Sequence, residues 1–371
     1  MAESWRAGMM IGMDARVVDR GERNGAERGQ SGLLMEDEPR RDAAIDAPQA
    51  LPDVCVVIPT HRRPDLLRRC LRAVLAQDYP ADRVEIVVVE DGGPGEGEGV
   101  VTELRGQHPN ATIRYLAVAQ GGPGAARNAG WRSARASVVA LTDDDTIPDR
   151  GWLRAAGRAI GEGADAVSGR TVVPLADRPT DAEANVRGLE RATFATCNVH
   201  VRRAWLERVG GFDPRFRRAY REDSDLEFRL LDAGARIIRE DAALVVHPPR
   251  RARPFASLAQ QRGQFYDALL YREHPRRFRA TIRAHPPFAY YAMTLGLIGG
   301  PLALLLGHRR AALLAATIWT ALVGRFFLRR ARGTSRRPDH LAELAVTSAL
   351  IPPVAVYWRL RGAWAFRVPF L

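Results

Sequence analysis

The sequence predicts an α/β fold with a mostly parallel sheet, followed by apolar helices near the C-terminus. Three β-branched apolar runs support this prediction: VCVVIPT from Val54, VEIVVVED from Val84 and SVVALT from Ser137. Each run is continuous and of strand length, as expected of strands buried on both faces. Carboxylates follow the second and third runs. Because ligands gather at the carboxyl ends of parallel strands, we expect these acidic residues to form a site.

The segments between the runs predict the connecting elements. A helix should follow the first run, with Pro64 in its first turn and Tyr79 near its end. Residues 100–107 have a helical pattern, and residues 113–118 have the pattern of a short strand. A glycine-rich turn, GGPG, then opens a helix over residues 125–134. Strands alternating with helices are typical of a parallel sheet covered by helices.

Length and composition divide the chain of 371 residues into four parts. Residues 1–50 lack a sustained apolar period and are rich in charged residues and glycine, so we expect a disordered leader. Residues 51–250 should form the α/β domain. Residues 251–287 are basic and predict amphipathic helices at a membrane interface, and residues 288–371 predict a membrane region.

Three apolar stretches make up the predicted membrane region: 288–306, 311–328 and 341–358. Each is close to the roughly twenty residues that a bilayer core requires. Arginines flank the first two, which places those flanks and the α/β domain in the cytoplasm of a multi-pass or hairpin-anchored cell membrane protein. The third stretch contains Glu343 and precedes a basic, aromatic tail, so we favour a re-entrant or interfacial segment there. Buried helices of a soluble protein are the alternative.

The net charge of +12 comes mostly from arginine. It is compatible with nucleic acid, an anionic membrane or a phosphate-bearing substrate. No zinc-finger or helix-turn-helix spacing is present, and the arginines crowd the flanks of apolar segments, so we expect a membrane partner and no nucleic acid. Cys55, Cys70 and Cys197 are scattered and odd in number, which indicates buried thiols rather than disulfides.

Two acidic motifs carry the expected chemistry. In TDDDT, from Thr142 to Thr146, adjacent carboxylates would repel one another unless a cation compensated. Mg²⁺ or Mn²⁺ bound together with substrate phosphates would supply that compensation, and a solvated acidic turn is the alternative. In REDSDLEFRL, four carboxylates from Glu222 to Glu227 follow the turn GGFDP and precede a helix, where helix capping is the ordinary explanation.

The chain resembles family 2 glycosyltransferases of the GT-A fold over about Val54 to His247. Five segments carry the resemblance in the family's order: VVIPTHRRPDLLRRCL, VVVEDG, QGGPGAARNAG, LTDDDTIPDRGWL and NVHVRRAWLERVGGFDPRFRRAYREDSDLEFRLLDAG. The resemblance implies a GT-A nucleotide-sugar-binding fold and an inverting, metal-dependent enzyme of the hexosyltransferase class. Such an enzyme moves a sugar from a nucleotide diphosphate sugar to an acceptor hydroxyl.

The resemblance also implies donor-binding residues. Thr60 and either Glu90 or Asp91 should hold the base and ribose. The family usually has two aspartates where this chain has Glu90 and Asp91, so which of the two contacts the base stays open. The remaining implied donor-binding residues are Arg127, Asn128, Asp143 and Asp144. For Arg127, an exposed helix arginine is an equally weighted alternative.

By the same resemblance, Asp143 and Asp145 should bind the metal, with Asp145 as the principal ligand to the ion that bridges the diphosphate. The metal would stabilise the leaving nucleoside diphosphate. Asp223 should be the catalytic base, and Glu222 should orient the acceptor. Asp225 is expected to help build the helix, and for His247 a structural role is favoured over a metal or phosphate contact.

Two other functions compete with this interpretation. A nucleotidyltransferase shares the α/β architecture and the bound metal, but it would not need the Glu-Asp pair after GGFD. A non-enzymatic, basic membrane-associated binding protein would leave both acidic motifs unexplained. The acceptor, a lipid-linked or cell-envelope glycan, is suggested only by the predicted membrane anchor.

Overall fold

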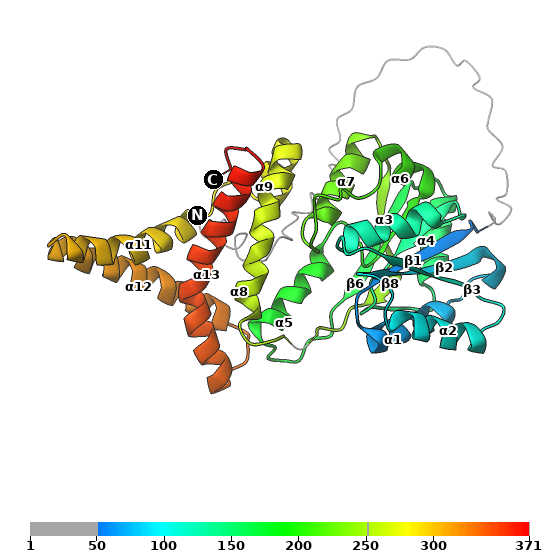
Figure 1. The fold of residues 1–371 in the computed structure, drawn as a ribbon, viewed down its shortest axis with the longest axis horizontal. Coiled ribbons are helices and arrows are strands. Elements are labelled where there is room, and N and C mark those ends of the chain that lie inside the picture. The colour runs from blue at the N-terminus through cyan, green and yellow to red at the C-terminus, as the bar shows by residue number, and fades with distance from the viewer. Residues whose placement is uncertain (1–50, 251, 371) are drawn as a thin grey trace, which may run out of the picture.

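The computed structural model describes residues 51–250 and 252–370, and the expected leader at residues 1–50 lies outside the described residues. An α/β unit occupies one side of the molecule and a group of long helices the other (Figure 1). The α/β unit contains an eight-stranded sheet in the order β3-β2-β1-β4-β7-β6-β8-β5. Its strands are β1 Val54–Thr60, β2 Val84–Asp91, β3 Thr112–Val118, β4 Val138–Leu141, β5 Ile147–Pro148, β6 Ala166–Val172, β7 Val199–Arg202 and β8 Ile237–Val246.

The strands expected from the three apolar runs are present, and they form the parallel half of the sheet. Strands β3, β2, β1 and β4 pair in parallel. Beyond β4 the sheet is mixed, because β7 pairs antiparallel with both β4 and β6 while β6 and β8 are parallel. The expectation of a mostly parallel sheet therefore describes the half formed by β3, β2, β1 and β4 better than the other half.

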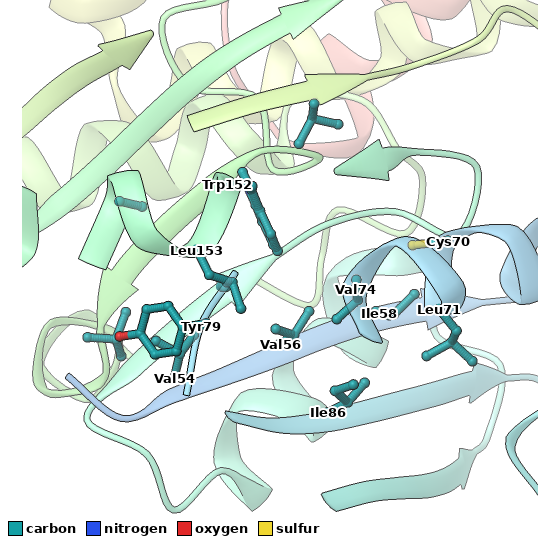
Figure 2. Packing of buried hydrophobic residues seen from close by; sticks show 14 of the residues in the cluster. Val54, Val56, Ile58, Cys70, Leu71, Val74, Tyr79, Ile86, Trp152 and Leu153 are labelled. Carbon is teal, nitrogen blue, oxygen red and sulfur yellow. The ribbon is translucent and has the colours of Figure 1, made fainter. Parts of the chain in front are cut away.

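The parallel half of the sheet is buried on both faces, as the continuous apolar runs predicted. Along β1, Val54, Val56 and Ile58 point into one core cluster, which Figure 2 shows beneath Cys70 of the first helix. The alternate residues, Cys55 and Val57, point into a second cluster on the opposite face. The three cysteines are buried and free, which confirms the prediction of buried thiols.

Helices cover the sheet and continue into a separate helical group. The predicted first helix begins at Pro64, and the glycine-rich turn opens a helix at Pro123, as expected. The helices of the α/β unit are α1 Pro64–Leu75, α2 Gly97–Gln107, α3 Pro123–Ser133, α4 Trp152–Gly161, α5 Asp181–Val186, α6 Arg203–Val209 and α7 Glu222–Asp232. The helices after it are α8 Ala256–Gln260, α9 Gln264–Glu273, α10 Pro275–Arg277, α11 Phe288–Leu305, α12 Arg309–Ala331 and α13 Pro338–Ala365.

The last three helices, α11, α12 and α13, are each long and apolar enough to cross a membrane. Helices α11 and α12 form a hairpin that projects away from the α/β unit (Figure 1). Only a small part of their apolar windows is buried, 11% and 6%, so most of their apolar side chains are exposed. Helix α13 continues as one helix of 28 residues through Pro352 and Pro353, and the expectation of a re-entrant or interfacial segment there stays a prediction.

Buried contacts join the helical group to the α/β unit close to α7. Arg221, just before α7, donates from Nε to Asp267 of α9 at 2.6 Å, and Arg359 of α13 lies 3.8 Å from the same carboxylate. Phe216 and Phe228 pack in an apolar cluster with residues of α9 and with Phe370. The two parts therefore meet directly behind the helix that begins with Glu222.

Candidate active site

The loop after β4 holds the three aspartates of TDDDT at the carboxyl edge of the sheet. Its two flanking threonines are fully buried and fix the loop: Thr142 Oγ1 donates to the Cys197 carbonyl at 3.0 Å, and Thr146 Oγ1 donates to the Asp143 carbonyl at 2.7 Å. The loop then continues into β5, which pairs antiparallel with the end of β8. This pairing brings residues about a hundred positions apart in the chain to the same edge.

Asp143, Asp145 and His247 form a cluster whose ligand atoms all lie within 4.8 Å of one another. His247 Nε2 is 3.4 Å from Asp145 Oδ1, while its buried Nδ1 has no hydrogen-bond partner among the described residues. Arg250 places its Nε 2.9 Å from Asp145 Oδ2, so a cationic group already occupies one side of this carboxylate. Two carboxylates and an imidazole are ligands that suit a divalent cation such as Mn²⁺ or Mg²⁺. The cluster therefore fits the metal that the sequence predicted.

His247 changes role from the one favoured by the sequence. It follows the last residue of β8 and lies against Asp145, so the structure supports a place in the metal cluster over a purely structural histidine. Although burial favours the neutral acid, Arg127 and His247 hold the pKa of Asp143 below its usual range. A carboxylate that stays ionised is the form that a metal ligand requires.

Asp144 points back into the protein, away from this cluster. Its Oδ2 accepts from Thr60 Oγ1 at 2.8 Å, and its Oδ1 accepts from Arg63 Nη1 at 3.0 Å. Burial raises the pKa of Asp144 to about 6. Thr60 and Asp144, both predicted to bind the donor, are thus bonded to each other at the ends of β1 and β4.

Glu90 and Asp91 lie at the end of β2 with different partners. Asp91 accepts from the backbone N–H groups of Gly121 and Gly122 at 2.7 and 3.0 Å. Glu90 is buried and accepts from the Arg62 N–H at 2.9 Å. Gly122 has φ +88°, and a Cβ there would lie 2.4 Å from the Arg217 carbonyl, so this turn requires glycine. Which of the two carboxylates contacts a base stays a prediction.

Arg127 connects the metal cluster to the second acidic motif. Its Nη2 donates to Asp143 Oδ1 at 2.7 Å, and its Nη1 donates to Glu222 Oε1 at 3.3 Å. The side chain is only 3% exposed, which excludes the exposed helix arginine considered from the sequence. A buried arginine bonded to two carboxylates fixes the distance between them, and so it holds the two acidic motifs in a fixed relative position.

Asn128, for which the resemblance implied donor binding, bonds to protein groups through its amide, and its contact with a donor stays a prediction. Its amide nitrogen donates to the Phe212 carbonyl at 2.7 Å, and its oxygen accepts from the Phe212 N–H and from Trp131 Nε1. These bonds attach α3 to the GGFDP turn. Sequence spacing could not predict these bonds, because Phe212 lies 84 residues away.

The Glu-Asp pair opens α7 beside Thr196. Asp223 Oδ1 accepts from Thr196 Oγ1 at 2.7 Å, and Oδ2 accepts from the Thr196 N–H at 3.2 Å. Burial raises the pKa of Asp223, and burial together with the charge of Asp223 raises the pKa of Glu222 to about 8. Both shifts favour a proton on the Glu222–Asp223 pair near neutral pH.

Asp225 serves the fold, as expected from its place in the helix. It is 1% exposed, accepts from Arg229 one turn later and lies 3.1 Å from His274 Nε2 at the end of α9. Sequence reasoning missed Thr196, Arg63 and Arg250, which hold or face the predicted carboxylates. The local sequence weakly indicated Arg250, which lies in a basic run after β8. No local pattern indicated Thr196.

Comparisons with known proteins agree with this site. A sequence profile described as glycosyl transferase family 2 matches residues 55–225. Glycosyltransferase AglE of Haloferax volcanii is 29% identical over 221 residues, which are 57% of this chain and 71% of AglE. Pre-mycofactocin glycosyltransferase of Mycobacterium tuberculosis is 30% identical over 216 residues, which are 53% of this chain and 43% of that protein. The chain thus spans less than half the length of some relatives.

A solved structure shows the same fold. Mannosyltransferase PcManGT from Pyrobaculum calidifontis, in complex with GDP-Man and Mn²⁺, superposes with a TM-score of 0.53 and 22% identity. The superposition covers 86% of this chain and 89% of that one. The profile match, the glycosyltransferase relatives and the shared fold together support a glycosyltransferase of the GT-A fold. The similarity to glycosyl transferase family 2 extends over residues 55–225.

Proposed function

We propose that this glycosyltransferase transfers a sugar from a nucleotide diphosphate sugar to an acceptor hydroxyl with inversion, in a metal-dependent reaction. The observation that carries the proposal is the Arg127 bridge between Asp143 and Glu222. The Arg127 guanidinium holds Asp143 of the cation-binding cluster on one side and Glu222 of the proton-accepting pair on the other. PcManGT, which shares the fold, is a mannosyltransferase in complex with GDP-Man and Mn²⁺.

Asp143, Asp145 and His247 would hold the metal, Mg²⁺ or Mn²⁺. A divalent cation at this position would neutralise the negative charge that develops on the departing nucleoside diphosphate. Arg250 and Arg63 approach Asp145 from the same edge, at 2.9 and 4.0 Å, and would face the diphosphate. Thr60, Glu90, Asp91 and Asp144, at the ends of β1, β2 and β4, would form the wall against which the base and ribose bind.

Asp223 would act as the base. Inverting transfer needs one carboxylate to accept the proton of the attacking hydroxyl, and Thr196 orients both oxygens of Asp223. The raised pKa of Asp223 brings its basicity closer to the working pH. Glu222, which carries a proton near neutral pH, would donate a hydrogen bond that orients the acceptor.

The C-terminal helices would anchor the enzyme, and residues 51–250 and 251–287 would form the catalytic domain and an interfacial segment, respectively. Arginines before α11 and after α12 support a cytoplasmic catalytic domain, because positively charged flanks stay on that side. A membrane location in turn supports a lipid-linked or cell-envelope glycan as the acceptor. The same proposal includes α13 in the membrane anchor, either as a spanning helix or as a helix at the membrane interface.

The metal dependence can be tested with Asp145→Asn. Calorimetry of the full chain with UDP- and GDP-sugars should show donor binding that needs Mn²⁺ or Mg²⁺ and is weakened at least about tenfold by chelator, because the diphosphate and the carboxylates repel each other without a cation. Asp145→Asn should remove the difference between the metal and chelator conditions. Asp149→Asn is the matched control, since Asp149 is nearby, exposed and outside the cluster. Equal donor affinity with and without chelator would contradict the proposal.

The reaction itself is tested by its products. Incubation with the accepted donor should release a nucleoside diphosphate, and the new glycosidic bond should have the anomeric configuration opposite to that of the donor by NMR. Release of pyrophosphate would instead identify a nucleotidyltransferase. Retention of configuration would exclude direct attack assisted by Asp223.

A further inference from the structure

A cavity with both polar and apolar walls lies away from the active site, between the α/β unit and the candidate membrane helices. It has a volume of about 230 Å³ and is bounded by α5, by the segment around α8 and α9, and by α11, α12 and α13. Ligand pockets typically measure about 300–1,000 Å³, so this one is large enough for a headgroup but too small for a complete glycolipid.

The cavity carries an excess of positive charge. Four arginines line it, whereas Asp181 is the single acidic residue among the described residues of its wall. Asp181 is already used, because it accepts from Arg330 Nη2 at 2.5 Å and pairs with His340 at 3.3 Å. Within residues 51–250 and 252–370, Arg283, Arg329 and Arg332 have no carboxylate partner. These arginines therefore favour an anionic ligand.

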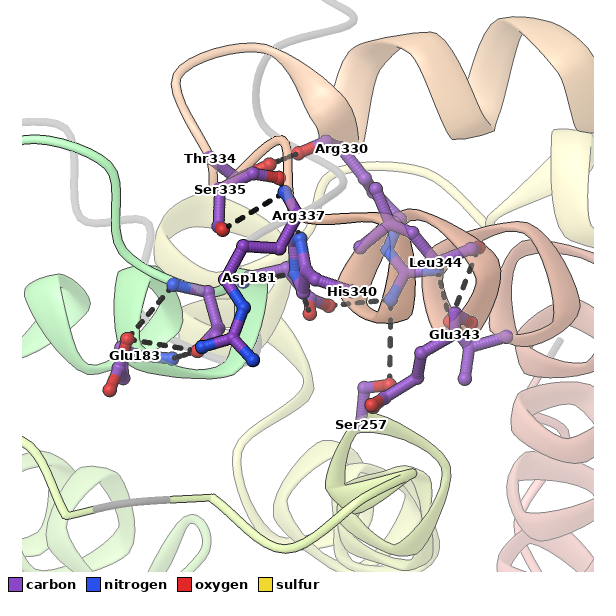
Figure 3. A network of polar contacts seen from close by, with 12 residues as sticks. Asp181, Glu183, Ser257, Arg330, Thr334, Ser335, Arg337, His340, Glu343 and Leu344 are labelled. Carbon is purple, nitrogen blue, oxygen red and sulfur yellow. Dashed lines mark hydrogen bonds and ion pairs between the residues drawn. The ribbon is translucent and has the colours of Figure 1, made fainter.

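The floor of the cavity is built by buried, fixed side chains. Figure 3 shows Arg330 at the centre of a network that joins α5, α8, α12 and α13. Its guanidinium donates to Thr347 Oγ1 and Ser348 Oγ, both at 2.8 Å, and to Ser257 Oγ at 3.4 Å. Arg330 is 6% exposed, so this is a preformed site and not a flexible basic surface.

The other wall of the cavity is apolar and belongs to the membrane helices. Tyr290 of α11, Phe326 of α12 and Ile351 of α13 line it, and Phe326 also lies under the guanidinium of Arg329 at 5.5 Å. Beyond this wall, α11 and α12 expose large apolar residues along the hairpin, such as Leu297, Ile298 and Leu314. The basic groups lie where the apolar stretch of α12 ends, which is the level of lipid headgroups in a spanning helix.

We propose that this cavity binds the phosphate headgroup of a membrane amphiphile, with Arg283 and Arg329 contacting the phosphate and the apolar tail leaving along α11 and α12. A polyisoprenyl phosphate and an anionic phospholipid both have this chemistry. The inference goes beyond the transfer reaction, because it concerns binding in the absence of any nucleotide sugar.

The test measures binding to the full chain in a neutral detergent by native mass spectrometry, without donor or metal. Farnesyl phosphate and phosphatidylglycerol supply the two sources of a phosphate headgroup, farnesol lacks the phosphate, and inorganic phosphate lacks the tail. At least one of the two phosphate amphiphiles should bind about tenfold more tightly than farnesol and than inorganic phosphate. The better of the two identifies the source.

Variants locate the site. Arg329→Gln and Arg283→Gln should each weaken the preferred amphiphile about tenfold, because a charge-assisted contact is lost. Arg310→Gln is the matched control, since it removes the same charge from the exposed opposite end of α12 and should leave binding unchanged. Thermal unfolding of each variant without ligand shows that it is folded, and Arg332→Gln replaces either variant that is not.

Three results would overturn the inference. Equal binding of farnesol would show that the arginines are not used, and equal binding of inorganic phosphate would show that no tail is recognised. An equal loss in Arg310→Gln would assign the effect to overall charge. A chain that fails to transfer sugar can still bind the amphiphile, so failure here is distinguishable from failure of the proposed reaction.

Discussion

The strand-end cluster of Asp143, Asp145 and His247 and the helix-start pair of Glu222 and Asp223 are both acidic and share Arg127, but their other partners differ. Arginines face the cluster, with Arg127 on Asp143 and Arg250 on Asp145. Asp223 has both of its oxygens bonded to Thr196, which is neutral. Despite burial, Arg127 and His247 hold the pKa of Asp143 below its usual range, as a cation ligand requires, whereas burial outweighs Arg127 and raises the pKa of Asp223, as a proton acceptor needs. Two acidic motifs of similar composition are therefore suited to different roles, metal binding in one and proton acceptance in the other.

The largest expected effect is on turnover in Asp223→Asn. The substitution keeps the size and the Thr196 contact but removes the charge that accepts the proton, so kcat should fall about a hundred- to ten-thousand-fold. Donor affinity, measured by calorimetry, should stay nearly unchanged. Asp225→Asn is the control: it should lower the melting temperature, because Arg229 and His274 lose their partner, while changing kcat far less. Near-normal turnover of Asp223→Asn would move the base to Glu222.

His200, a buried histidine outside the candidate active site, should make the free energy of unfolding depend on pH. His200 of β7 is 1% exposed, stacks against Trp152, and has its pKa lowered by burial from 6.5 to about 3. The unfolded chain therefore binds a proton that the folded chain does not, between about pH 6.5 and 3. Stability should be greatest above pH 6.5 and should fall below it by up to about 1.4 kcal/mol per pH unit.

His200→Leu checks this pH dependence, because leucine fills the site without titrating. Its free energy of unfolding should fall less steeply than the wild-type value between pH 6.5 and 5, as followed by denaturant titration in detergent. The exposed His108→Leu is the control and should keep the wild-type slope. Identical slopes for all three proteins would contradict the assignment.

Arg250→Ala tests whether the cluster is set to receive a cation. Arg250 is about half exposed, and exposed ion pairs contribute about 0.2–1 kcal/mol, so removing it should tighten Mn²⁺ binding without donor by up to about fivefold. Arg253→Ala, which removes a nearby exposed charge, should have no effect. Weaker Mn²⁺ binding in Arg250→Ala would show that Arg250 organises Asp145 and does not compete with the metal.

The smallest effect is expected for Glu222→Gln. Glu222 carries a proton near neutral pH, and glutamine imitates that protonated form, so kcat at pH 7 should change less than about threefold. The apparent pKa of the acidic limb of the pH-rate profile should remain above the usual range of aspartate pKa values, because Asp223 stays buried. A loss of turnover as large as that of Asp223→Asn would show that an ionised Glu222 is required.

The positions of the acidic motifs could be predicted because local pattern decides them. A continuous apolar run specifies a buried strand, and its end specifies where the chain reaches the edge of the sheet, so Asp143 and Asp145 were placed correctly at such an edge. Asp225 was likewise recognised as structural from its helical position. The role of Asn128 was not predictable in this way, since its partner Phe212 comes from a turn that packs against α3 only in the folded chain.

Local sequence patterns specify the strands, the apolar helices and the acidic motifs, because each depends on neighbouring residues and on a period of two or about 3.6. How these elements meet depends on long-range packing in the folded chain. The antiparallel pairing of β5 with β8 brought His247 to Asp145, the packing of α3 brought Arg127 between Asp143 and Glu222, and the docking of α9 and α13 enclosed the arginine cavity. Such contacts join residues far apart in the chain, and their energies depend on burial and distance that no local pattern contains.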